Sequence, residues 1–252
     1  MRLSVRGFSL RYGVRVAVDR VDLQANPGEV LAILGANGSG KSSLLRGLAG
    51  VQRHAGTVEW SGGEPGRVGY MPQDTSARSQ LTAFEVVLLG RLRSLAFKVD
   101  VADLKAARDT LEEVGISHLA ERPIRELSGG QRQLVFLAQV LSAGPSALLL
   151  DEPTSALDIT HQLRVLALLR SATHSRRLTT IVVLHDLNAA ARFADRIVMM
   201  HDGRVAGHGT PAEALTAETL RRCYGVEVAV FSGPDGAPVI LPLRPCDADA
   251  AP

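Results

Sequence analysis

The segment GANGSGKS, residues 35–42, has the residue types and the spacing of a phosphate-binding loop. It matches G-x-x-x-x-G-K-[ST] and stands between a run typical of a strand and a run typical of a helix. The glycines let backbone N–H groups turn inward, and the helix N-terminus adds positive charge. Lys41 would contact the β- and γ-phosphates, and the Ser42 hydroxyl would bind Mg²⁺. A glycine-rich turn that fits by chance is the alternative, and the flanking strand and helix argue against it. The candidate nucleotide-binding residues of this loop are Gly35, Ala36, Asn37, Gly38, Ser39, Gly40, Lys41, Ser42 and Ser43.

Two adjacent carboxylates, Asp151 and Glu152, follow the apolar run ALLL at residues 147–150. A carboxylate at a strand tip can hold Mg²⁺ through water, and its neighbour suits a general base for the attacking water. A solvated acidic turn is the alternative, which the upstream phosphate loop disfavours. The loop alone does not distinguish a kinase, a GTPase and an ATPase. The carboxylate pair, together with the absence of a guanine-reading NKxD string, favours an ATPase.

His185 follows another apolar run, in TIVVLHD at residues 180–186. A lone histidine there is more often a structural residue. Beside a γ-phosphate, a carboxylate base and water, it can instead contact the phosphate and hold the water in line. We favour the second interpretation because the other parts of such a site are present. The remaining histidines show no metal-ligand spacing and receive no role.

The elements that must position these residues follow an α/β pattern. Alternating apolar and polar residues predict strands within 3–13 and 16–24, and EVLAIL at 29–34 suits a buried parallel strand. Helical spacing takes over from residue 82 to residue 142. We therefore predict one domain, with a core formed by 1–81 and 143–252 and an inserted helical subdomain at 82–142. Further elements expected are a helix at 41–50, strands within 57–63 and 67–74, a helix at 161–173, a hairpin turning at Asp202-Gly203, and a strand pair around Pro-Asp-Gly within 227–245.

The bulk composition excludes several classes of protein. A formal net charge of +2 in 252 residues gives no reason to expect a nucleic-acid surface. Cys223 and Cys246 lack metal-ligand spacing and are expected to be incidental reduced thiols. The longest uncharged stretch, Gln133 to Leu150, is interrupted by Gly144-Pro145, and the first residues lack the apolar core of a secretory signal. We therefore expect a cytosolic chain that does not cross a membrane by itself.

The segment LSGGQRQ, residues 127–133, completes a recognisable set. With the phosphate loop, the Asp-Glu pair and the histidine after a strand, it resembles the nucleotide-binding domain of ATP-binding-cassette (ABC) transporters. The resemblance runs from about Tyr12 to about Thr210, and the four motifs together are highly specific. It implies a P-loop NTPase core of mixed or parallel sheet with flanking helices, an N-terminal antiparallel β part and an inserted α-helical subdomain, with ATP and Mg²⁺ as ligands.

The resemblance also implies a role for each matching residue. Tyr12 would stack on adenine, Gln73 would sense Mg²⁺ and water, and Asp158 of SALD would cross a dimer interface. Each of these three has a plain alternative: a surface aromatic, a turn residue and a helix cap, respectively. Departures from the family pattern are Ser43 in place of threonine and Leu134 in place of arginine. The implied catalytic residues are Glu152 (base), His185 (switch), Gln73 and Lys41. The residues that would hold Mg²⁺, partly through water, are Ser42, Gln73 and Asp151. Those that would contact the γ-phosphate bound by a second subunit are Ser128, Gly129, Gly130 and Gln131.

The family geometry makes two chains necessary for a complete site, which implies a homodimer. The glycines of LSGGQ would then let backbone N–H groups approach a phosphate closely. The resemblance further implies two transmembrane permease subunits, an indirect extracytoplasmic solute-binding protein, and a peripheral position on the cytoplasmic face of the inner membrane. The solute would not touch this chain.

The sequences of residues 130–141, 151–169 and 183–216, and of the tail, resemble those of ATPases of bacterial importers for iron–siderophore, haem and cobalamin. We expect an ATP-hydrolysing subunit that powers such an importer. The alternatives are an ATPase for another solute (zinc or manganese), an exporter ATPase, and a soluble ABC ATPase not involved in transport.

Overall fold

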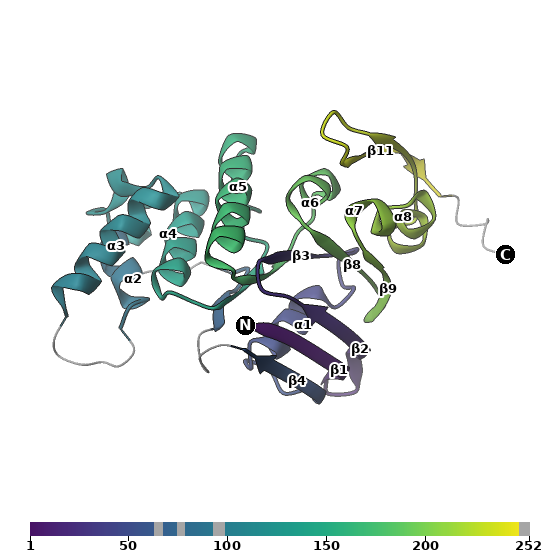
Figure 1. Ribbon diagram of the computed structural model, residues 1–252, viewed down its shortest axis with the longest axis horizontal. Helices are drawn as coiled ribbons and strands as arrows, with labels where there is room; N and C mark the ends of the chain where they lie inside the picture. Colours follow the sequence, from purple (N-terminus) through teal and green to yellow (C-terminus); the bar gives the residue numbers. More distant parts are fainter. Residues whose placement is uncertain (63–67, 75–78, 93–98, 247–252) are drawn as a thin grey trace.

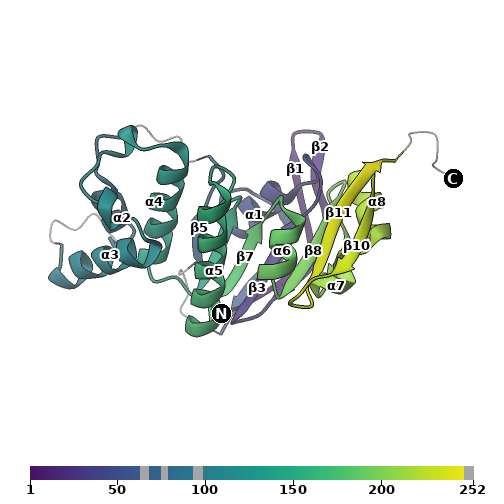
Figure 2. The ribbon, with the colours of Figure 1, turned by 90° about the horizontal axis from the view of Figure 1, so that it is seen from above.

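The computed structural model describes residues 1–62, 68–74, 79–92 and 99–246. Parts of the predicted core (63–67, 75–78 and 247–252) and of the predicted helical subdomain (93–98) lie outside the described residues. The molecule is elongated, with sheets in the middle, a cluster of helices at one end and a two-stranded hairpin at the other (Figure 1, Figure 2). Within the described ranges, no helix is both long enough and apolar enough to cross a membrane.

A six-stranded sheet forms the middle of the molecule, and all its neighbouring strands are parallel except the last pair. The strand order is β5 (Val68–Met71), β6 (Ala147–Asp151), β7 (Thr179–Val183), β3 (Glu29–Leu34), β8 (Arg196–His201) and β9 (Arg204–Gly209). The antiparallel pair β8–β9 turns at Asp202-Gly203, which confirms the predicted hairpin. The parallel sheet confirms the predicted α/β class.

Both faces of this sheet are covered, which explains the continuous apolar run of β3. Leu31 and Ile33 share a core with α1 (Lys41–Leu48). The alternate residues Val30 and Ala32 pack in a second core with α5 (Ile159–Arg176) and α6 (Leu187–Phe193). Sequence patterns predicted α1 and α5 but not α6, which is seven residues long and alanine-rich and therefore carries no clear apolar period.

An antiparallel sheet of three strands packs over α1 (Figure 1). Its order is β2 (Arg15–Ala25), β1 (Arg2–Tyr12) and β4 (Ala55–Ser61). Leu3, Phe8 and Leu10 of β1 are fully buried against α1 and the central sheet. This is the predicted N-terminal antiparallel β part, and it places Tyr12 at the end of β1.

Three helices gather at one end of the molecule: α2 (Ala83–Leu89), α3 (Val101–Val114) and α4 (Gly129–Ser142) (Figure 2). Two short 3-10 helices, Ser117–Leu119 and Ile124–Glu126, connect α3 to α4. Leu134, Leu137 and Leu141 of α4 lie in the same core as the central sheet. Through this packing α4 holds the LSGGQRQ segment in a fixed position relative to the sheet.

The opposite end contains two helices and the predicted strand pair. Helices α7 (Pro211–Ala214) and α8 (Ala217–Tyr224) precede β10 (Val226–Ser232) and β11 (Pro238–Pro245), which pair antiparallel. The strand pair confirms the predicted turn around Pro-Asp-Gly, whereas the two helices were not predicted. Cys223 is buried and Cys246 is partly exposed, and both are free thiols.

Candidate nucleotide-binding and hydrolysis site

The phosphate loop connects β3 to α1, as its sequence predicts. Gly40 precedes α1 with a φ of 100°, and a Cβ atom there would lie 2.4 Å from the Ala17 carbonyl oxygen. Only glycine fits this position. The following residue, Lys41, is only 5% exposed, and its Nζ donates to the carbonyl oxygens of Gly35 (2.8 Å) and Ala36 (3.0 Å). These two bonds hold the ammonium group within the curve of the loop.

Asp151 ends β6 directly opposite the start of α1. Its side chain is fully buried, and the Ser42 hydroxyl donates to Oδ1 at 3.0 Å. The other carboxylate oxygen, Oδ2, has no hydrogen-bond partner within the described residues. A buried, unpaired carboxylate oxygen beside a hydroxyl fits a hard cation such as Mg²⁺, which prefers oxygen ligands. The residues present therefore fit the metal that the sequence implies.

Burial shifts the pKa values of both charged groups at this point. It raises the pKa of the Asp151 carboxyl, an effect that the Ser42 hydrogen bond opposes and the nearby Glu152 carboxylate reinforces. It lowers the pKa of the Lys41 ammonium, while Glu152 and Asp151 oppose that shift. Both groups would be better stabilised in their charged forms by a bound nucleotide with its cation.

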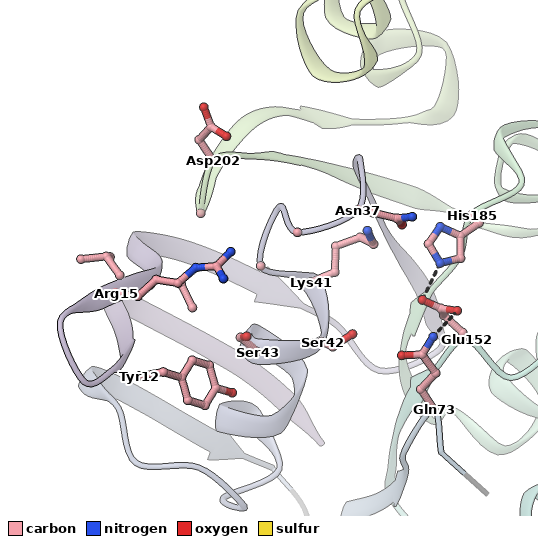
Figure 3. A pocket seen from close by; sticks show the side chains of 15 residues that line it. Tyr12, Arg15, Asn37, Lys41, Ser42, Ser43, Gln73, Glu152, His185 and Asp202 are labelled. Carbon is pink, nitrogen blue, oxygen red and sulfur yellow. Dashed lines mark hydrogen bonds and ion pairs between the residues drawn. The ribbon is translucent and has the colours of Figure 1, made fainter. Parts of the chain in front are cut away.

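Glu152 is held on both of its carboxylate oxygens. Gln73 Nε2 donates to Oε2 at 2.8 Å, and the ring of His185 contacts Oε1 through Nε2 (Figure 3). Glu152 has a φ of 53°, in the left-handed region that residues with a side chain seldom adopt. The histidine, expected at the phosphate, thus contacts the carboxylate and is 45% exposed. Three predicted residues from distant parts of the chain meet at one point.

A cavity of about 960 Å³ extends from this cluster to Tyr12. In Figure 3, Tyr12 lies at one end, the Gln73–Glu152–His185 cluster lies at the other, and Lys41 and Ser42 lie between them. This order suits a nucleotide with its base at Tyr12 and its terminal phosphate at Glu152. The predicted residues that line the cavity are Tyr12, Asn37, Gly38, Gly40, Lys41, Ser42, Ser43, Gln73, Glu152 and His185.

The LSGGQ residues lie in a different cavity, of about 450 Å³. Ser128, Gly130, Gln131 and Asp158 line it, and none of them lines the cavity of the phosphate loop. Ser128 is the N-cap of α4: its Oγ accepts from Gln131 N at 3.2 Å, and Gln131 Oε1 accepts from Ser128 N at 3.0 Å. The hydroxyl hydrogen of Ser128 stays available for another acceptor.

The segment 155–158 packs closely against this helix start. A Cβ atom on Gly130 would lie 2.7 Å from the Ala156 carbonyl oxygen, so a side chain would clash with backbone. We expected this glycine to permit approach to a phosphate; what the structure shows is that it permits a close contact within the chain. Asp158 caps α5 by accepting from His161 N at 2.8 Å, and the His161 bonds lower the pKa of its carboxyl. The cap that we weighed as an alternative role for Asp158 is therefore present.

Comparison with known proteins agrees with this geometry. A family model described as ABC transporter matches residues 18–155. The chain belongs to the ABC transporter family. A hemin import ATP-binding protein of Gloeobacter violaceus is 39% identical, with 96% of this chain and 94% of that protein covered. The ferric enterobactin transport ATP-binding protein of Escherichia coli is 34% identical, with 96% of this chain and 94% of that protein covered.

Solved structures of ABC proteins share the fold. The structure of an inward-facing transporter described as metal-chelate type has a TM-score of 0.85 and 30% identity, covering 96% of this chain and 97% of that one. A dimeric ATP-binding cassette bound to ADP and phosphate has a TM-score of 0.74 and 26% identity, covering 83% and 98%. The chain is thus an ABC ATPase that binds and hydrolyses ATP.

Several residues that line the nucleotide cavity of this ABC ATPase, or that contact its phosphate loop, were not predicted. Asp202 and Gly203 line it from the β8–β9 turn, and Gly203 N donates to Ser39 O at 3.1 Å. Tyr224, at the end of α8, accepts from Gly35 N at 2.9 Å. These residues are far from the phosphate loop in the sequence, and no local sequence pattern indicates that they lie close to it in space. Gln133 of α4, which is 2% exposed, was not predicted either. A polar residue at a core position of the helix was the sequence signal that could have identified it.

Asp151→Asn should stabilise the nucleotide-free protein while abolishing hydrolysis. Folding raises the pKa of Asp151, so between its unfolded and folded pKa values the folded state holds a proton that the unfolded state has lost. The free energy of unfolding therefore falls as pH rises through this range. At neutral pH, removing the buried charge should raise Tm by about 2–4 °C, equivalent to about 1 kcal/mol in a chain of this size. Thermal melts at neutral and acid pH test this, and the gain should vanish below the ordinary aspartate pKa. An equal or lower Tm at neutral pH would contradict it.

Tyr224→Phe should weaken ATP binding about three- to tenfold, because the Gly35 N–H loses its acceptor and the phosphate loop becomes less ordered. The turnover rate at saturating ATP should change little. Titration with a fluorescent ATP analogue measures the effect. The wild-type protein, titrated under the same conditions, is the reference. Equal affinities of the wild type and Tyr224→Phe would show that the contact does not order the loop. Burial also raises the pKa of Tyr224 to about 12, so its phenol stays protonated in every practical buffer.

Proposed function

We propose that this chain is the ATP-hydrolysing subunit that powers a bacterial importer of metal chelates, of the iron–siderophore, haem or cobalamin kind. One observation carries the hydrolytic part: Glu152 is held by Gln73 and His185 at the end of a cavity that begins at Tyr12. The importer part is supported by relatives named for hemin import and ferric enterobactin transport, which match 96% of this chain.

In the proposed reaction, ATP lies along the cavity with adenine on Tyr12. Lys41 and the loop N–H groups hold the β- and γ-phosphates. Glu152 accepts a proton from the attacking water, and Gln73 and His185 orient that carboxylate and the water. The oxygen of water bonds to the γ-phosphorus as the bond to the bridging oxygen breaks, giving ADP and phosphate. Ser42, Gln73 and Asp151 would hold Mg²⁺, partly through water, and the ion would neutralise the developing phosphate charge.

The site is completed by a second copy of the chain in this proposal. Ser128, Gly130, Gln131 and Asp158 line a cavity separate from that of the phosphate loop, and Gly129 is the first residue of α4. A two-fold axis would bring these residues to the γ-phosphate of the partner. ATP would join the two halves, and loss of phosphate would release them. The solved dimeric cassette supports this arrangement by its likeness to the chain.

The movement would drive two transmembrane permease subunits, with this chain bound peripherally at the cytoplasmic face of the inner membrane. The core would comprise residues 1–81 and 143–252, and the subdomain 82–142 would transmit the motion together with Gln73. An extracytoplasmic solute-binding protein would deliver the chelate to the permease, so specificity would lie outside this chain.

Uptake in a strain lacking this gene tests the proposal. The strain should take up two of the three radiolabelled chelates (ferric siderophore, haem and cobalamin) normally and fail to take up the third. The wild-type gene should restore uptake of that third chelate. The Glu152→Gln gene should not restore it. Normal uptake of all three chelates, with loss of zinc or manganese uptake, would contradict the chelate assignment. Loss of efflux in place of uptake would contradict the import direction.

A further inference from the structure

Gln133 occupies a core position of α4 although it is polar. It is 2% exposed and lies one and two turns before Leu137 and Leu141 on the buried face of the helix. Leaving an amide there without partners would be costly, so its hydrogen bonds indicate why it is present. Its place within α4 also makes it part of the helix that Ser128 begins.

The Gln133 amide bonds to the backbone on either side of the catalytic turn. Nε2 donates to the Glu152 carbonyl oxygen at 2.6 Å, and Oε1 accepts from Ala156 N at 3.1 Å. The amide orientation follows from the chemistry, because a carbonyl only accepts and a backbone N–H only donates. Gln133 therefore fixes both the turn at Glu152 and the segment 155–158.

Glu152 needs such support. Its φ of 53° costs free energy for a residue with a Cβ atom, and such conformations persist only where the surroundings impose them. The Ser155 hydroxyl also donates to the Glu152 carbonyl, at a longer 3.2 Å, and Glu152 N donates to Val183 O at 3.2 Å. The bond from Gln133 is the shortest of the three. It sets the backbone orientation from which the carboxylate reaches Gln73 and His185.

We propose that Gln133 is a positioning residue for hydrolysis, which holds the Glu152 backbone in its left-handed turn so that the carboxylate faces the γ-phosphate bound by the same chain. This inference rests on the proposed role of Glu152 as base. Gln133 touches neither the nucleotide cavity nor the separate cavity of Ser128. Its effect is thus on the rate of the chemical step and not on ATP binding.

Two substitutions test the proposal: Gln133→Leu and Gln133→Met, the second chosen because a flexible side chain of similar length fills the space with less risk to folding. Each should lower kcat about tenfold to hundredfold through misplacement of the base, while the Kd for ATP changes less than about twofold. Gln139→Leu and Gln139→Met make the same changes further along α4, outside its buried residues, and should keep the wild-type kcat. Equal kcat values in the two pairs would overturn the proposal.

Mixed dimers separate positioning from a general weakening of α4. A dimer of one Lys41→Ala chain and one chain with an intact phosphate loop has a single nucleotide site, which uses Glu152 of the intact chain and Ser128 of the other. Gln133→Met placed in the intact chain should slow hydrolysis about as much per site as in the homodimer. Placed in the Lys41→Ala chain, it should slow hydrolysis much less, because there it can act only through the segment 155–158, whose Asp158 lies beside Ser128. Equal slowing from either position would show that α4 is merely weakened, and the proposal would fail.

The outcome is distinguishable from failure of the proposed function. If Glu152→Gln hydrolyses ATP at the wild-type rate, Glu152 is not the base and the foundation of the inference is wrong. If Glu152→Gln is inactive but Gln133→Met matches Gln139→Met, the base assignment stands and only the role of Gln133 is rejected.

Discussion

Glu152→Gln should abolish ATP hydrolysis while ATP binding is retained. An amide of the same shape still fits between Gln73 and His185, but it cannot accept a proton from the attacking water. General-base catalysis is typically worth about 10²- to 10⁴-fold, so kcat should fall by at least that range. Steady-state phosphate release measures the rate, and an equilibrium titration with ATP measures the affinity. A wild-type rate would contradict the assignment of Glu152 as base.

The same variant should also accumulate as an ATP-bound dimer. In the proposed cycle only hydrolysis and phosphate release separate the two chains, so blocking hydrolysis leaves ATP between them. Size-exclusion chromatography with Mg²⁺ and ATP should show a doubled mass for Glu152→Gln and a smaller mass for the wild type after turnover. Lys41→Ala is the control, since it removes the ammonium group of the phosphate loop and should not dimerise with ATP.

The parts of the site that lie in short contiguous motifs were predictable from the sequence. Local backbone geometry determines both the loop between β3 and α1 and the position of the carboxylates at the end of β6. The residue types that such geometry needs can be recognised in the sequence. The buried strand β3 was predictable because a sheet covered on both faces requires an unbroken apolar run. The Asp202-Gly203 turn was predictable from its dipeptide.

Contacts between distant segments could not be read from the sequence. Tyr224 reaches Gly35 only because α8 packs beside β8 and β9, and nothing near either residue encodes that packing. The contact between Gly130 and Ala156 has the same origin, since two loops meet where α4 and α5 begin. Helices α6 and α7 were missed because they are too short to show an apolar period. Even α8, of eight residues, offers only two buried positions.

Ser128→Arg should abolish hydrolysis without changing ATP binding at the phosphate loop of the same chain. The arginine would fill the cavity that Ser128 lines and block the approach of the partner's γ-phosphate, whereas the cavity of Lys41 is separate. We expect kcat to fall at least about 100-fold, in line with the loss of a phosphate-stabilising group. Arginine also lacks the capping oxygen of serine, so α4 should lose about 1 kcal/mol of stability, which a thermal melt would register.

Complementation in trans decides whether Ser128 acts on the partner's nucleotide. The Ser128→Arg chain keeps a working phosphate loop, and the Lys41→Ala chain keeps a working LSGGQ segment. Each variant alone should be inactive. An equal mixture with ATP should form mixed dimers with one complete site each and should regain hydrolysis that neither variant shows alone. ATP binding by Ser128→Arg as weak as that of Lys41→Ala would mean that Ser128 serves its own chain's nucleotide. A mixture that stays inactive, although both chains fold and mixed dimers form, would mean that the two motifs do not share a site across the two-fold axis.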